Sequence, residues 1–226
     1  MIILPKKGID MKTRIIWGVL AITMSLLLSG CSTEISLFNQ QNLDNWKPYL
    51  GNSDVDPATV WSVQDGVLRC EGKPSGYIRT AEEYSNYKLH VEWRWADEPS
   101  NSGILLHTTG EDKLWPLCVE AQLMHENAGD LVTIQNGSAI TVNGERHTPT
   151  GDKFYKIIPK QNDSTENLPG QWNSYDIVCK DNTIQLTVNG VLQNIATEST
   201  LVLGAICLQS EGSPIEFRNI KLTPLE

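Results

Sequence analysis

The segment from Tyr87 to Trp95 alternates strictly between apolar and polar side chains. The polar positions carry an imidazole, a carboxylate and a guanidinium, on His90, Glu92 and Arg94. Successive side chains of a strand point to opposite faces, so this pattern predicts a strand with one buried face and one face able to do chemistry. We expect the two tryptophans of the segment to pack in the core rather than to bind a ligand.

A second segment, Cys118–Leu123, repeats the pattern and places Glu120 and Gln122 on one side. We expect the two segments to lie side by side in one sheet, where they would form a polar floor. Glu92 and Glu120 would then lie within several ångströms of each other. This register is inferred from alternation alone.

Most of the remaining chain reads as short strands joined by tight turns. Asp65-Gly66 separates two strand-like runs and predicts a hairpin, because both turn positions tolerate positive φ. Asp181-Asn182 and Asn189-Gly190 mark two further turns of an antiparallel meander that starts at Tyr175. Additional strands are expected at Gly76–Arg79, Ile104–Thr108, Ile140–Val142, Ala205–Gln209 and Ile215–Leu222.

Many short, two-faced strands predict an all-β fold, a jelly-roll sandwich in which two antiparallel, curved sheets pack face to face. In such a sandwich one sheet can leave its concave outer face open, and we expect a sugar site there. The stretch from His125 to Pro169 has weaker periodicity and many polar residues. Because loops of that length in a compact domain are usually functional, we expect it to form a rim over the concave face.

The N-terminal residues have the pattern expected of a targeting signal. A basic start precedes an apolar run shorter than the ~20 residues of a membrane span, and the run ends in Leu28-Ser29-Gly30-Cys31. This motif is similar to the lipobox of bacterial lipoproteins, which implies diacylation of the Cys31 thiol and cleavage before it. We expect residues 1–30 to be a lipoprotein signal peptide and residues 31–226 a single domain. The protein would be exported and anchored by its lipid to the bacterial outer membrane or the periplasmic face; a plain secretory signal or an anchor helix is the alternative.

The charge balance argues against nucleic acid as a partner. Residues 1–30 hold four Lys or Arg and one Asp, so the remaining 196 residues carry 14 basic and 26 acidic side chains, a net charge of −12. Nucleic-acid binding needs a basic face, which this composition does not supply. The acidic surplus leaves carboxylates available for a cation or a sugar.

The four cysteines beyond Cys31 lie in predicted strands, at spacings that match no metal or redox motif. They are Cys70, Cys118, Cys179 and Cys207. Export permits disulfides, but we expect free thiols that pack in the core as small apolar groups.

A series of short motifs appears in order along the chain, each of them common on its own. They are Leu37-Phe38-Asn39 with Leu43-Asp44-Asn45-Trp46, Trp61–Leu68, Gly76–Thr80, Glu92-Trp93-Arg94, Asn101–Ile104, Glu120-Ala121-Gln122, Gly170–Asn173, Val188-Asn189-Gly190 and Glu216–Ile220. In this number and order they resemble the 3-keto-disaccharide hydrolase domain family, which is related in fold to concanavalin-like and laminin-G-like lectins. The resemblance covers about Ile35 to Leu222.

The resemblance implies an exported bacterial protein with a concave-face site that acts on oxidised sugars. Two positions depart from the family pattern. Leu208–Gly212 lacks the histidine that often precedes this glycine, so that role is lost or is taken by Glu211. His107 stands where many members place an arginine. Both departures concern the substrate rather than the fold.

The chemistry implied by the family can be assigned to residue types present here. A carbonyl at C3 of a hexose acidifies the C2 proton, so the bond at C1 can break by proton abstraction and elimination, followed by addition of water. This route needs a base near C2, an electrophile at the C3 oxygen and an acid at C1. Glu92 and Glu120 are the candidate bases, and His125 is a third catalytic candidate. Arg94 could keep a carboxylate ionised or stabilise the developing enolate.

Several polar and aromatic residues are candidates for binding the substrate. Trp115, beside a proline, is expected to stack on a sugar ring, and Asn101 belongs to a turn where the backbone could pass close to a ligand. The full set is Arg94, Asn101, His107, Trp115, Gln122, Gln209 and Arg218. Each also has a structural interpretation, as a hydrogen-bonding residue on a strand surface or as part of a tight turn.

The sequence does not identify a cofactor, and a divalent metal ion is one candidate. His90, His107 and His125 could join Glu92 and Glu120 in a mixed nitrogen and oxygen site that polarises the C3 carbonyl, although their spacing matches no metal motif. No glycine-rich nucleotide-binding fingerprint is present.

The interpretation that unites these features is a carbohydrate-active enzyme that cleaves or hydrates 3-keto-glycosides. Its expected partners are a carbohydrate and, through the lipid, a membrane. Two alternatives remain open: a non-catalytic, lectin-like carbohydrate-binding module, and a conventional endo-glycosidase with paired carboxylates.

Overall fold

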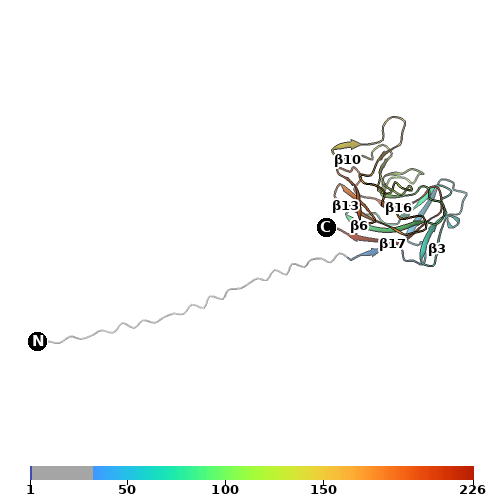
Figure 1. Ribbon diagram of the computed structural model, residues 1–226, viewed down its shortest axis with the longest axis horizontal. Helices are drawn as coiled ribbons and strands as arrows, with labels where there is room; N and C mark the ends of the chain where they lie inside the picture. Colours follow the sequence, from blue (N-terminus) through green and yellow to red (C-terminus); the bar gives the residue numbers. More distant parts are fainter. Residues whose placement is uncertain (2–32) are drawn as a thin grey trace. The chain divides into compact units, whose positions relative to one another are not determined.

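A computed structural model describes Met1 and residues 33–226 of the chain (Figure 1). The expected signal peptide and Cys31 lie outside the described residues. Residues 33–226 belong to one compact unit. Within this range no helix has both the length and the apolar character that crossing a membrane would require.

The unit consists of two large antiparallel sheets, a hairpin and a single helical turn. The eight-stranded sheet contains β1 (Ile35–Ser36), β3 (Trp61–Gln64), β4 (Val67–Cys70), β6 (Tyr87–Trp95), β13 (Asn173–Lys180), β14 (Thr183–Val188), β15 (Val191–Ala196) and β17 (Ile215–Pro224). The seven-stranded sheet contains β2 (Trp46–Leu50), β5 (Gly76–Thr80), β7 (Gly103–Thr109), β8 (Leu117–Gln122), β9 (Leu131–Ile134), β12 (Tyr155–Ile158) and β16 (Ala205–Ser210). Strands β10 (Ile140–Val142) and β11 (Glu145–His147) form the hairpin, and η1 (Pro57–Thr59) is the 3-10 turn.

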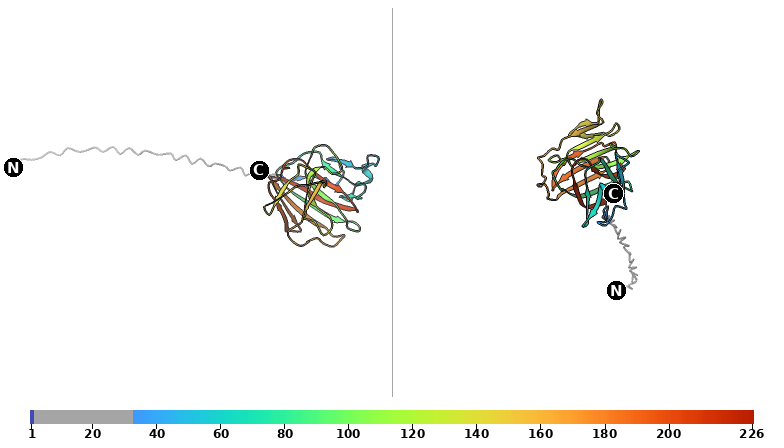
Figure 2. Two further views of the ribbon diagram at one scale, coloured as in Figure 1. Left: turned by 90° about the horizontal axis from the view of Figure 1, so that it is seen from above. Right: turned by 90° about the vertical axis from the view of Figure 1, so that its right-hand side faces the viewer.

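The strand order confirms the predicted sandwich. The eight-stranded sheet runs β15-β14-β13-β6-β17-β4-β3, with β1 paired to β17, and the seven-stranded sheet runs β12-β9-β8-β7-β16-β5-β2. Figure 1 shows β13, β6 and β17 side by side in the first sheet. The other two views show the same layers of strands from above and from one side (Figure 2).

The interior between the sheets is filled by the apolar members of the alternating strands. Trp93 and Trp95 of β6 are 0% and 2% exposed, which confirms that both pack in the core. Val119 of β8 joins the same buried cluster from the other sheet. Each strand of this kind therefore turns its polar residues outward, away from the opposing sheet.

The turn signals read from the sequence are present in the structure. Asp65 and Gly66 adopt φ values of 50° and 77° between β3 and β4. Asn189 and Gly190 adopt 48° and 79° between β14 and β15. Positive φ at both central residues matches the twist of the flanking strands, so these short hairpins close without splaying.

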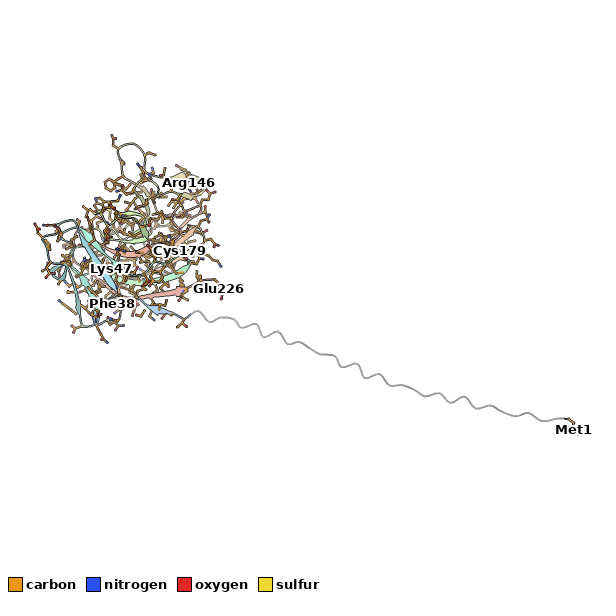
Figure 3. All side chains as sticks on the ribbon, turned by 180° about the vertical axis from the view of Figure 1, so that it is seen from behind. Met1, Phe38, Lys47, Arg146, Cys179 and Glu226 are labelled. Carbon is orange, nitrogen blue, oxygen red and sulfur yellow. The ribbon has the colours of Figure 1, made fainter. Side chains whose placement is uncertain are left out.

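The cysteines behave as predicted. All four in the described part of the chain are free and buried. Cys179 lies among the packed side chains in Figure 3, in contrast to Arg146, an exposed residue of the β10–β11 hairpin. Burial raises the pKa of Cys179 and of Cys207 to about 12, so neither thiol ionises near neutral pH.

The expectation that the strands bearing Glu92 and Glu120 are neighbours is wrong. Strand β6 pairs with β13 and β17 in the eight-stranded sheet, whereas β8 pairs with β7 and β9 in the seven-stranded sheet. Both strands turn their apolar residues to the shared core, so Glu92 and Glu120 face away from it on opposite sides of the sandwich. Alternation predicts which face of a strand is polar, but it does not predict which sheet the strand joins.

The expectation that His125–Pro169 forms only a rim is also wrong in part. This stretch contributes β9 and β12 to the seven-stranded sheet itself. All four residues of β9 are buried. A strand buried on both faces shows no apolar alternation, which is why the sequence did not reveal it.

Candidate functional site

A pocket of about 220 Å³ opens on the outer face of the seven-stranded sheet. Strands β8, β9 and β12 supply much of its lining. Within β8, Val119 and Ala121 join the core between the sheets, whereas Glu120 and Gln122 line the pocket. The strand alternation predicted from the sequence therefore places both polar residues of β8 in a cavity.

Glu120 lines this pocket and is only 4% exposed. Its cross-strand neighbours are Leu105 of β7 and Val132 of β9, and both are apolar. Its Oε1 atom has no hydrogen-bond partner among the described residues. A buried acid without a partner is costly to ionise, and an acid of this kind in a cleft is a candidate for a functional residue.

Gly103 makes the position of Glu120 possible. It lies in β7 opposite Gln122, and a Cβ atom built on it would overlap the Glu120 carboxyl group. Only glycine leaves room for the carboxyl to lie across β7. The motif Asn101-Ser102-Gly103, interpreted from the sequence as a turn close to a ligand, instead passes close to an acidic side chain.

A second acid, Glu211, lines the same pocket. It follows β16 and forms an isolated bridge with Asn101 across the sheet. Burial raises the pKa of Glu211 to about 7, although a hydrogen bond from Asn101 opposes the rise. Burial and, second, the charge of Glu211 raise the pKa of Glu120 to about 8.

Near neutral pH the two carboxyl groups therefore hold at least one proton between them. Two like charges close together in a poorly solvated site cannot both ionise readily. Near neutral pH the pair offers one group able to accept a proton and one able to donate it. This is the arrangement that general acid and base catalysis requires.

Three amides complete the polar part of this face, with different surroundings. Gln122 is fixed, because its Oε1 accepts hydrogen bonds from the backbone N–H groups of Leu123 and Met124, both at 3.0 Å. Gln209 is 2% exposed, and its Oε1 has no partner within residues 33–226. The Oδ1 of Asn101 is likewise buried and unpartnered in that range. Unpaired acceptors can accept hydrogen bonds from the hydroxyl groups of a sugar.

The other half of the pocket is apolar. Trp115 stacks on Phe154, with ring centroids 5.9 Å apart and an angle of 27° between the planes. The remaining wall is formed by Met124, Val132, Ile134, Tyr155 and Ile157. Trp115 therefore lies at the pocket, as expected for a residue that stacks on a ligand ring.

Glu92, Arg94 and Arg218 lie on the outer face of the other sheet and form ion pairs there. Arg218 Nε lies 2.6 Å from Glu92 Oε2, and Arg94 Nε lies 2.6 Å from Glu216 Oε2. The guanidinium carbons of Arg218 and Arg94 lie 4.0 and 4.6 Å from the ring centroid of Trp172. The structure therefore does not bring these three predicted site residues to the pocket of Glu120.

The environment of Glu92 has the opposite effect on its acidity from that of Glu120. Burial favours the protonated form, but hydrogen bonds from Asn219 and Arg218 and the charge of Arg218 outweigh it, so the pKa of Glu92 is lowered. Its two oxygens accept hydrogen bonds from Arg218 and Asn219 at 2.6 and 2.7 Å. A carboxylate held ionised in this way is a weak base.

The histidines are dispersed and do not line the pocket. His107 is 1% exposed, its Nδ1 lies 2.9 Å from the carbonyl oxygen of Leu201, and burial lowers its pKa. His125 Nδ1 lies 3.4 Å from Glu166 Oε2. His90 Nδ1 lies 3.0 Å from Asp176 Oδ1, on the outer face of the eight-stranded sheet. Among the described residues, no cluster of three or more His, Cys, Asp or Glu side chains could hold a metal ion.

The sequence did not reveal the apolar wall of the pocket. It indicated Glu211 only as a replacement for the histidine that the family often has before this glycine. Phe154, Tyr155 and Ile157 fall in the stretch interpreted as a polar rim, yet two adjacent aromatic residues followed by isoleucine are a local strand signal. Glu211 is far from Glu120 in sequence, and no spacing rule relates the two. The departure from the family pattern at Leu208–Gly212 was the one available signal for it.

Comparison with known proteins agrees with this architecture. No curated protein matched the chain. A crystal structure of a protein from Parabacteroides distasonis ATCC 8503, provisionally described as a glycosyl hydrolase, superposes with a TM-score of 0.62 and 24% identity, over 85% of this chain and 94% of that chain. The carbohydrate binding module CBM66 from Bacillus subtilis gives 0.57 and 11%, over 80% and 96%. The beta-glucanase of Bacillus licheniformis gives 0.54 and 17%, over 88% and 100%.

These three structures share the fold and confirm the predicted concanavalin-like jelly roll. The sequence itself matches the model of the 3-keto-alpha-glucoside-1,2-lyase-like domain over residues 33–223, nearly all of the described range. The resemblance drawn from the ordered motifs is therefore confirmed, and the chain belongs to the family of 3-keto-alpha-glucoside-1,2-lyase-like domains.

Proposed function

We propose that the protein is a carbohydrate-active enzyme that cleaves 3-keto-glycosides in the pocket of Glu120. The observation that carries the proposal is the pair of carboxyl groups in one pocket, buried Glu120 and half-buried Glu211, with pKa values of about 8 and about 7. Family membership supports the choice of an oxidised sugar as substrate. The jelly-roll fold, which is shared with a glucanase and a sugar-binding module, is compatible with a carbohydrate ligand.

The reaction proceeds in two stages. An ionised carboxylate of the pair removes the proton from C2, which the C3 carbonyl makes acidic, and the electrons move to the C3 oxygen as an enolate. The enolate then expels the oxygen substituent at C1, which leaves with a proton from the protonated carboxyl, and a C1–C2 double bond forms. Addition of water to that double bond, with the proton returned to C2, gives the free 3-keto sugar.

The residues around the pair suit this sequence of steps. The site needs one proton acceptor and one proton donor at the same pH, and two carboxyl groups with raised pKa values provide both. Asn101 lines the pocket and has an unpaired acceptor oxygen that suits a sugar hydroxyl, and Gln209 has another on the same face of the sheet, outside the lining of the pocket. Burial of Glu120 keeps water from competing for its proton.

The test is to incubate the domain, residues 31–226 with Cys31→Ser, with a 3-keto-disaccharide and separately with its unoxidised parent, and to follow the products by NMR. We expect release of 3-keto-glucose from the oxidised sugar alone. A parallel reaction with a chelator reports whether a metal ion participates. Cleavage of the unoxidised sugar would contradict the proposal in favour of a conventional glycosidase, and binding without turnover would favour a non-catalytic module.

Export and lipid anchoring complete the proposed role. The support is the sequence Leu28-Ser29-Gly30-Cys31, in which Cys31 would carry the lipid. Growth of producing cells with a clickable fatty acid should label the wild-type protein and should fail to label Cys31→Ser. Equal labelling of the two proteins would exclude Cys31 as the anchor.

A further inference from the structure

The two halves of the pocket differ in chemistry and in their place on the sheet. Glu120 and Glu211 are associated with β8 and β16, on either side of β7 in the middle of the sheet. The apolar half lies over β9 and over β12, which is the edge strand. A ligand that fills the pocket therefore meets proton-transfer groups at one end and an apolar surface at the other.

The apolar half is unusually exposed for its composition. Phe154 and Tyr155 are each 39% exposed, Ile157 is 43% exposed and Met124 is 46% exposed. Cross-strand register continues this surface inward, because Ile157 pairs with Val132, which in turn pairs with Glu120. The apolar surface is therefore continuous with the reactive carboxyl group rather than an isolated patch.

We propose that this half of the pocket is a subsite for the leaving group, and that it selects glycosides whose C1 substituent is an aromatic ring over disaccharides. The inference rests on the proposed function only in placing the sugar at Glu120. A second sugar would bring several hydroxyl groups against a wall of aromatic and aliphatic side chains that offers them few hydrogen bonds, and burial of such groups without partners is unfavourable. A planar aromatic ring meets no such penalty, and it can extend the stack of Trp115 and Phe154.

Size and leaving-group chemistry agree with an aromatic substituent. The pocket volume of about 220 Å³ is below the ~300–1,000 Å³ typical of sites for drug-sized ligands, so it suits a single ring beside the carboxyl pair. A phenolic oxygen is also a better leaving group than a sugar hydroxyl, because its pKa is near 10. Elimination at C1 then depends less on a donated proton.

The test uses binding of unoxidised ligands, so that it does not depend on turnover. Calorimetry on residues 31–226 with Cys31→Ser would compare 4-nitrophenyl glucoside, methyl glucoside and a glucose disaccharide. We expect the aryl glucoside to bind at least about ten-fold more tightly than the other two, which corresponds to ~1.4 kcal/mol. Phe154→Ala should remove most of this preference. Leu203→Ala, at an apolar residue 52% exposed and outside the pocket, should preserve it.

The outcomes separate this inference from the proposed function. Equal or tighter binding of the disaccharide, or an aryl preference unchanged in Phe154→Ala, would overturn the leaving-group subsite. If a 3-keto-disaccharide is cleaved faster than a 3-keto aryl glucoside, the proposed function stands and the subsite is refuted. If neither oxidised sugar is cleaved but the aryl preference and its loss in Phe154→Ala are observed, the subsite stands and the reaction is refuted.

Discussion

The outer faces of the two sheets each present a glutamate from an alternating strand, and the two glutamates differ in almost every physical respect. Glu92 is held between Arg218 and Asn219, and its pKa is lowered. Glu120 is more deeply buried, its Oε1 has no partner among residues 33–226, and its pKa is raised to about 8. Two strands with the same sequence pattern thus give one carboxylate held ionised in an ion pair and one buried acid with a raised pKa. The neighbours across the strands, not the pattern, decide which is which.

Exchanging each acid for its amide should give the largest contrast. Glu120→Gln removes a group that transfers a proton, so kcat/KM for a 3-keto-glycoside should fall by about 10²–10⁴. Glu92→Gln should leave kcat/KM within about three-fold, because an ion-paired carboxylate on the opposite face takes no part in the reaction. Steady-state kinetics on the two folded variants would measure this, and equal losses would break the comparison.

Glu120 and Glu92 should make the stability of the protein depend on pH in opposite directions. The raised pKa of Glu120 means that the folded protein binds a proton that the unfolded chain releases, so stability falls as pH rises from about 4.5 to about 8. At about 1.4 kcal/mol per pKa unit, wild-type protein should lose up to roughly 5 kcal/mol of stability across this window through Glu120, and Glu120→Gln should not show this loss. The lowered pKa of Glu92 gives stability that is present above its unfolded-state pKa and lost as pH falls through its folded-state pKa.

Denaturant unfolding at pH 5 and pH 8 would test both signs. The difference in free energy of unfolding between the two pH values should shrink in Glu120→Gln. Glu92→Gln should instead be destabilised relative to wild type at pH 8. A wild-type protein whose stability rises steadily through this range would require Glu120 to have a partner that the structure does not show.

A substitution at Gly103 can displace the carboxyl group of Glu120 without replacing any titratable residue. The Cβ of Gly103→Ala would overlap the Glu120 carboxyl, and relief of such crowding typically costs ~1–3 kcal/mol. Stability should fall by about that amount, and kcat/KM should fall because the carboxyl is displaced. Gly51→Ala is a suitable control, since its closest neighbour is a methyl group of the flexible Leu114 side chain. Wild-type activity in Gly103→Ala would show that the position of Glu120 is not critical.

The smallest effect on stability is expected for the ion pair between Arg218 and Glu92, on the outer face of the eight-stranded sheet. Arg218→Ala removes the ion pair with Glu92 and the contact with the Trp172 ring. Partly exposed ion pairs and cation–π contacts are each worth about 0.5–1 kcal/mol, so unfolding should become easier by about 1 kcal/mol with catalysis unchanged. A double-mutant cycle with Glu92→Gln would isolate the pair, and a large loss of activity in Arg218→Ala would extend the site to this face.

The sequence predicted the strands and turns well because those depend on local features. Alternation identified β6 and β8, and residues that tolerate positive φ marked the hairpins at Asp65-Gly66 and Asn189-Gly190. Strands β9 and β12 were missed, since β9 is buried on both faces and shows no period. The assignment of strands to sheets could not be predicted, because it depends on contacts between residues far apart in the chain.

The residues predicted for the candidate site therefore divide between the two faces of the sandwich. Glu120, Gln122, Asn101, Gln209 and Trp115 lie on the outer face of the seven-stranded sheet or at its pocket, whereas Glu92, Arg94 and Arg218 lie on the opposite side of the sandwich. Glu211 approaches Glu120 only because β16 and β8 flank β7. That arrangement is a property of the complete sheet and has no counterpart in any short stretch of sequence.

The position of β12 at the edge of its sheet has a consequence for how such a protein can diversify. An edge strand has one hydrogen-bonded neighbour, here β9, whereas β8 has two. Changes to the outward side chains of β12 therefore disturb few other contacts, while changes around Glu120 disturb many. Variants of this protein could acquire new substrate preferences by substitution along this edge while keeping Glu120 and Glu211, and a library confined to Phe154, Tyr155 and Ile157 is the natural place to alter selectivity in the laboratory.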